Sequence, residues 1–106
     1  MSDVPATRIV LLVGRRADII DDVRRHLDIS GVQLIGATSI DHVRSALAQT
    51  NIDHVIMGAG IDLETRLQIV REIFQSSDTT TVHMKDRATG PDGFLSFIAS
   101  LLGALT

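Results

Sequence analysis

Short hydrophobic runs alternate along this chain with segments in which hydrophobic residues recur every three or four positions. The runs are Arg8 to Val13, Val32 to Ala37, His54 to Met57 and Thr80 to Met84. Continuous runs of aliphatic, β-branched residues are typical of strands buried on both faces of a parallel sheet. We therefore expect four strands, and we place the Thr-rich last one at an edge of the sheet.

Each of the first three runs is followed by a segment with helical spacing. The predicted helices cover about 17–27, 40–50 and 63–75, with Ser39 and Asp62 as N-caps of the second and third. We expect each to bury one hydrophobic stripe against the sheet. The three stripes are Ile20, Val23 and Leu27; Ile40, Val43, Ala46 and Leu47; and Leu63, Leu67, Val70 and Phe74.

Four strands alternating with four helices predict a single three-layer α/β/α domain over residues 1–106, in which residues 1–7 form a flexible lead. The first and third strands are the most hydrophobic. With right-handed crossovers, this predicts a doubly wound parallel four-stranded sheet of order 2-1-3-4. Ligands bind such sheets beyond the carboxyl ends of the strands, where the strand order reverses. We therefore expect the loops Gly14 to Arg16 and Gly58 to Asp62 to face each other.

The pattern resembles the receiver domain of bacterial response regulators, a flavodoxin-like fold, over nearly the whole chain. Receivers carry an acidic pair after strand 1 that holds magnesium, a phosphoaccepting aspartate at the end of strand 3, and a lysine followed by proline after the last strand. Here these places hold Gly14 to Arg16, then Gly58, then Lys85 followed by Asp86. The chain is also one strand and one helix shorter. The resemblance implies a receiver scaffold that lacks the phosphoacceptor aspartate.

Arginines at the expected crevice would oppose a divalent cation, which requires converging carboxylates. We expect no metal, no cofactor and no phosphorylation of the receiver kind. Arg15, Arg16 and Lys85 suit an anion instead, with backbone amides near Gly58 and Gly60 as further donors. The alternative is that the arginines are solvated and that the glycines only permit a tight turn.

Composition and motif spacing speak against several other functions. A net charge of −3, without Trp or Tyr and with all three Phe on predicted helical stripes, disfavours nucleic acid. No hydrophobic run can cross a bilayer, so we expect a cytoplasmic protein without a membrane partner. Gly58 and Gly60 begin a dinucleotide fingerprint, but Leu63 stands where its third glycine belongs. The four histidines lack helical metal-pair spacing, and His83 is the first candidate for acid-base work near the crevice.

The last helix is predicted to begin at Gly90, Pro91 and Asp92 and to carry no charged side chain from Gly93 onward. A helix without a charged face is usually buried all round, but a domain this small can cover only one side of it. Its small residues would let a second helix approach closely, and a two-fold related copy is the simplest partner. We predict a homodimer, with another protein as the open alternative. The predicted interface is Ser96, Ala99, Ser100 and Gly103.

Two hypotheses of function follow, and no complete catalytic motif favours an enzyme. The first is a non-catalytic, receiver-like interaction or regulatory module that dimerises through its C-terminal helix. The second is a small anion- or nucleotide-binding protein that uses the crevice between the loops after strands 1 and 3.

Overall fold

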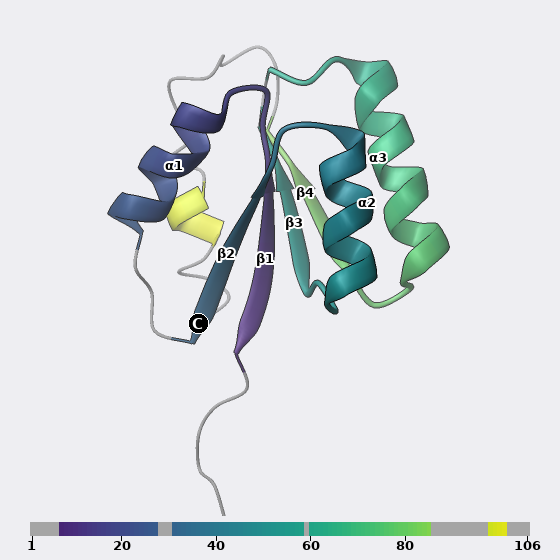
Figure 1. Cartoon of the computed structure of the whole chain (residues 1–106), viewed down its shortest axis with the longest axis horizontal. Helices are drawn as coiled ribbons and strands as arrows, with labels where there is room; N and C mark the ends of the chain where they lie inside the picture. The colour runs from purple at the N-terminus through teal and green to yellow at the C-terminus, as the bar shows by residue number, and fades with distance from the viewer. Residues whose placement is uncertain (1–6, 28–30, 59, 86–97, 102–106) are drawn as a thin grey trace, which may run out of the picture.

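The computed structural model describes residues 7–27, 31–58, 60–85 and 98–101. These residues form an α/β fold in which helices cover both faces of a parallel four-stranded sheet (Figure 1). Numbered along the chain, the strands lie in the order 2-1-3-4 across the sheet. This confirms the predicted doubly wound, flavodoxin-like arrangement.

The observed elements lie close to the predicted ones. The strands are β1 (Arg8–Val13), β2 (Val32–Ala37), β3 (His54–Met57) and β4 (Thr81–Met84). The helices are α1 (Ala17–His26), α2 (Ile40–Gln49) and α3 (Leu63–Ser76), and residues 98–101 are helical within the predicted last helix. The predicted lead up to residue 6, and the predicted start of the last helix at Gly90, lie outside the described residues.

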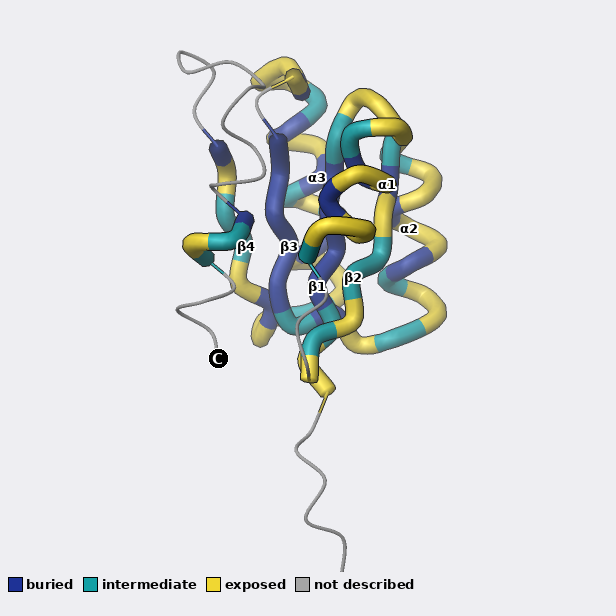
Figure 2. The backbone as a smooth tube through the Cα atoms, turned by 90° about the vertical axis from the view of Figure 1, so that its left-hand side faces the viewer, coloured by how far each residue is buried: buried dark blue, intermediate teal, exposed yellow. Residues whose placement is uncertain are grey.

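The two central strands are the most deeply buried. All four residues of β3 are buried, as are the last four of β1. Figure 2 shows these strands in dark blue, whereas the edge strands β2 and β4 carry exposed positions. Burial on both faces explains why β1 reads as an uninterrupted hydrophobic run.

Alternate residues of the strands fill two separate cores. Leu11 and Val13 of β1 pack with residues of α2 and α3 on one face of the sheet. Val10 and Leu12 pack on the other face with residues of α1 and with Ile98. Because strand side chains alternate between the two faces, each hydrophobic run supplies both cores.

Helix α1 packs closely on the edge strand β2 at Gly36. A Cβ atom added at Gly36 would lie 2.6 Å from Cγ2 of Ile20, which is nearer than real side chains come. Ile20 itself is buried in the α1-side core. The absent side chain at Gly36 therefore sets how closely α1 can pack on the sheet.

Helix α3 presents a different face to the sheet than the sequence predicts. Its buried residues are Arg66, Ile69 and Ile73. Leu63, Leu67 and Phe74 of the predicted stripe are 64%, 57% and 52% exposed, and Val70 is partly buried. The prediction that this stripe packs on the sheet is wrong for Leu63, Leu67 and Phe74, and so is the core position predicted for Phe74. Val70 does pack against the core on the α2 and α3 side. The other two phenylalanines, Phe94 and Phe97, lie outside the described residues.

The orientation of α3 has a physical reason. Ile69 and Ile73 form a second hydrophobic stripe about a quarter of a turn from the first. Arg66 lies on that second stripe and hydrogen-bonds the loop that precedes the helix. Burying this side of α3 removes Ile69 and Ile73 from water and also gives two loop carbonyl groups a hydrogen-bond donor.

Candidate functional site

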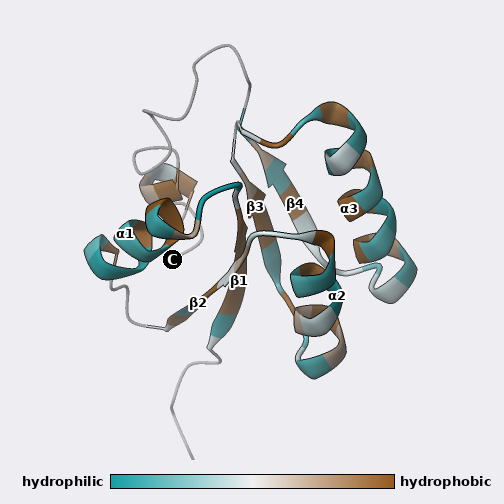
Figure 3. Cartoon of the chain, turned by 45° about the horizontal axis from the view of Figure 1, so that its top comes forward, coloured by the Kyte–Doolittle hydropathy of each residue, from teal (hydrophilic) through white to brown (hydrophobic). Residues whose placement is uncertain are grey.

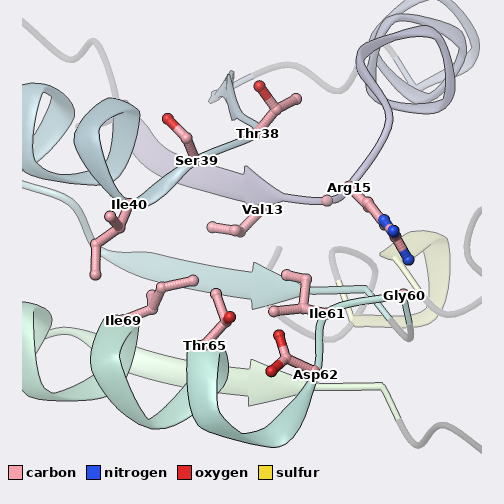
Figure 4. A pocket seen from close by; sticks show the side chains of 11 residues that line it. Val13, Arg15, Thr38, Ser39, Ile40, Gly60, Ile61, Asp62, Thr65 and Ile69 are labelled. Atoms are coloured by element: carbon pink, nitrogen blue, oxygen red, sulfur yellow. The ribbon is translucent and has the colours of Figure 1, made fainter.

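A pocket of about 390 Å³ lies beyond the carboxyl ends of the strands, where the loops after β1, β2 and β3 meet. Its lining residues are Val13, Gly14, Arg15, Thr38, Ser39, Ile40, Gly60, Ile61, Asp62, Thr65 and Ile69 (Figure 4). The pocket is on the side of the sheet that α2 and α3 cover. This is the region in which doubly wound sheets bind ligands.

The starts of α2 and α3 supply the polar groups of the pocket. Ser39 caps α2 by accepting a hydrogen bond from the amide of His42 at 3.2 Å, as predicted. Asp62 occupies the N-cap position of α3, but its side chain makes no capping hydrogen bond. In Figure 4 the carboxylate of Asp62 and the hydroxyl of Thr65 lie at the α3 side of the pocket.

Two of the five predicted anion-site residues meet in this pocket. A Cβ atom added at Gly60 would lie 3.5 Å from Cβ of Arg15, which shows that the loops after β1 and β3 touch. Figure 4 shows the guanidinium of Arg15 beside Gly60 at one end of the pocket. Among the described residues that line the pocket, Arg15 is therefore the one cation where the strand order reverses.

The other three predicted residues are used elsewhere. Arg16 donates two hydrogen bonds to Asp18, of 2.6 and 3.1 Å, and holds the pKa of that carboxyl below its ordinary value. The amide of Gly58 donates to the carbonyl of Val13 at 2.9 Å, so it extends the sheet. Lys85 is buried, its amide donates to Met57, and it does not line the pocket.

Arg66 was not singled out from the sequence and organises the loop after β3. Arg66 is buried, with 7% of the residue exposed. Nε donates to the carbonyl of Ile61 at 2.9 Å, and Nη2 donates to the carbonyl of Gly58 at 3.0 Å. A single side chain thus ties both ends of the loop that borders the pocket to the first turns of α3. The sequence signal for this role is a charged residue at helical spacing with Ile69 and Ile73.

His54 and His83 form a pair on the side of the sheet that α1 covers. Nε2 of His83 lies 3.4 Å from Nδ1 of His54, and the ring centroids are 5.5 Å apart. Burial lowers the pKa of His54, and the neighbouring His83 and Arg8 add to the effect. Neither histidine lines the pocket, so His83 is not placed for acid-base work there.

The exposed stripe of α3 is a second candidate site. We call Leu63, Leu67, Val70 and Phe74 the open flank of α3. Figure 3 shows hydrophobic positions recurring along this helix, which lies beside α2. Met84 of β4 is a further large apolar side chain that is 48% exposed. Within the described residues β4 pairs only with β3, so this surface borders an open edge of the sheet. Apolar surface gathered in this way often marks an interaction site.

The predicted dimer interface on the last helix is described only in part. Ile98 is buried in the α1-side core, and Leu101 packs against the same core. Ala99 is partly exposed and Ser100 is exposed. Ser96 and Gly103 lie outside the described residues.

Comparison with known proteins adds no relative. No protein family matches the chain, and no curated protein or solved structure is similar to it. Across residues 7–27, 31–58, 60–85 and 98–101, no cluster of three His, Cys, Asp or Glu side chains could hold a metal ion. None of the helices described is long and apolar enough to cross a membrane.

Proposed function

We propose that this protein is a non-catalytic interaction module with a receiver-like scaffold, and that it acts through the open flank of α3. The observation that carries the proposal is the exposure of Leu63, Leu67 and Phe74 on one side of a helix whose other apolar side is already buried. A helix that needed only to cover the sheet would carry polar residues on that flank. This surface, rather than the last helix, is the interface we now favour.

The proposal includes the absence of receiver-type phosphorylation. Gly58 stands where the receiver family has its phosphoacceptor, and its amide and carbonyl bond to Val13 and Arg66. Arg15 and Arg16 stand where that family binds magnesium. A divalent cation in the pocket would face the positive charge of Arg15.

Photo-crosslinking tests the interaction surface. The variant Leu67→p-benzoylphenylalanine, made in the cells that produce the protein, should give a defined adduct on illumination, because position 67 would contact the partner. Adding Phe74→Asp should remove the adduct by placing a charge in the same apolar surface. The matched control is Arg24→p-benzoylphenylalanine, on the exposed side of α1, which should give none. Equal labelling at positions 24 and 67, or no adduct at either, would contradict the proposal.

A second function is favoured by the pocket itself. Arg15, Thr38, Ser39 and Thr65 are among the residues that line a space large enough for a small phosphorylated molecule. If this pocket binds anions, inorganic phosphate or ATP should raise the melting temperature, and Arg15→Ala should abolish the rise. Arg24→Ala removes an exposed arginine outside this pocket and should leave the rise unchanged. No rise for the unmodified chain, or an equal rise for Arg15→Ala, would exclude this second function.

A further inference from the structure

The open flank of α3 points away from every neighbouring helix that the structure describes. Glu72 faces α2, since its carboxylate accepts a 2.9 Å hydrogen bond from Arg44. Arg66, Ile69 and Ile73 face the sheet. At 3.6 residues per turn, the open flank lies roughly half a turn of the helix surface away from Glu72. The open flank therefore faces outward, beyond the β4 edge of the sheet.

The open flank has the spacing of a helix-pairing seam. Leu63, Leu67, Val70 and Phe74 follow one another at intervals of four, three and four residues. This average of 3.5 residues is the period at which two α-helices keep one apolar seam in contact. A partner that presents a helix with the same period would bury the flank along its whole length.

The charged residues beside the seam restrict which helix can pair with it. Glu64 directly follows the first residue of the seam, and Arg71 directly follows the third. Both are exposed, and neither forms an ion pair with another described residue. In an antiparallel pair of identical helices, with the two-fold axis between Leu67 and Val70, Glu64 of each copy lies on the same side of the seam as Arg71 of the other, two residues or about 3 Å away along the helix axis, which two long side chains can span. The same symmetry sets Leu63 against Phe74 and Leu67 against Val70. A parallel pair would instead bring identical charges to the same level.

We infer that the partner of the open flank is a second copy of this chain, held by antiparallel packing of α3 on α3 with two reciprocal Glu64–Arg71 ion pairs. This inference rests on the proposed function and names its partner. Met84, on the same side of the sheet as α3, extends the interface onto β4. The flank is apolar at its centre and charged at its rim, as protein interfaces commonly are.

Sedimentation velocity of the full chain tests the inference at loadings from about 1 μM to about 1 mM, which covers the dissociation constants of weak and moderate dimers. The unmodified chain should pass from monomer to dimer within this range. Leu67→Glu should leave it monomeric throughout, because the charge would be buried in the seam. Gln68→Glu makes the same change at the adjacent exposed position and should leave the dimer intact.

Charge reversal tests the antiparallel register. Glu64→Arg alone and Arg71→Glu alone should each weaken the dimer, because like charges would then face each other twice. The double variant should restore association close to that of the unmodified chain. Far-UV circular dichroism of each variant confirms that α3 is still helical.

Three results would overturn the inference. One is a monomer at every loading, another is a dimer that Leu67→Glu and Gln68→Glu affect equally, and the third is a dimer that Ala99→Glu splits but Leu67→Glu does not. A monomer whose position 67 still crosslinks a protein of a different mass would contradict the inference but would still support the proposed function. Failure of the crosslink at position 67 would remove both.

Discussion

Replacing Arg66 with methionine is expected to lower the free energy of unfolding by about 2–4 kcal/mol, because two buried carbonyl groups would lose their donors. Methionine keeps the length and the helix propensity of the side chain, so the loss reports on hydrogen bonds to Ile61 and Gly58. Urea denaturation, followed by circular dichroism, measures the change. Arg66→Lys should lose less, since an ammonium keeps the charge but does not reproduce the fork of the guanidinium.

The matched control for Arg66 is Arg24→Met, an exposed arginine on α1 that should change stability by less than about 0.5 kcal/mol. Hydrogen exchange adds a local readout. If Arg66 ties down the loop after β3, amides of residues 60–62 should exchange faster in Arg66→Met than the global loss of stability explains. Equal stabilities for the two methionine variants would show that the carbonyl groups find other donors at little cost.

Gly36→Ala is expected to destabilise the fold by about 1–3 kcal/mol, because the added methyl group would overlap Ile20. The clash distance of 2.6 Å to Cγ2 of Ile20 requires α1 or the side chain to move. Gly14→Ala places the same methyl group 3.5 Å from Ile20, at ordinary contact distance, and should have a much smaller effect. Thermal and urea unfolding of the two variants measure the difference.

A double-mutant cycle assigns the cause at Gly36. In the Ile20→Ala background the overlapping atoms are gone, so Gly36→Ala should cost much less than it does in the unmodified chain. A cost that is the same in both backgrounds would place the strain elsewhere, for example in the backbone of β2.

The hydrophobic runs predicted strand positions and strand order because parallel strands buried on both faces need apolar residues at every position. The strand order followed from the difference in hydrophobicity between the strands. The most apolar strands, β1 and β3, occupy the centre, and the more polar β4 lies at an edge. The crevice location then followed from topology, and the structure has a pocket there. Five residues were predicted to form an anion site there, and two of them, Arg15 and Gly60, line the pocket.

What the sequence by itself determined is which residues share a face of each strand and helix, because the periods of 2 and 3.6 residues come from the backbone. Only the tertiary structure decided which of two apolar faces α3 buries. That choice depends on the fit of Ile69 and Ile73 between α2 and the sheet and on the carbonyl groups that Arg66 reaches. Contacts between residues distant in the chain set the rotation of a helix about its own axis, and local spacing does not encode them. The same contacts leave Leu63, Leu67 and Phe74 exposed.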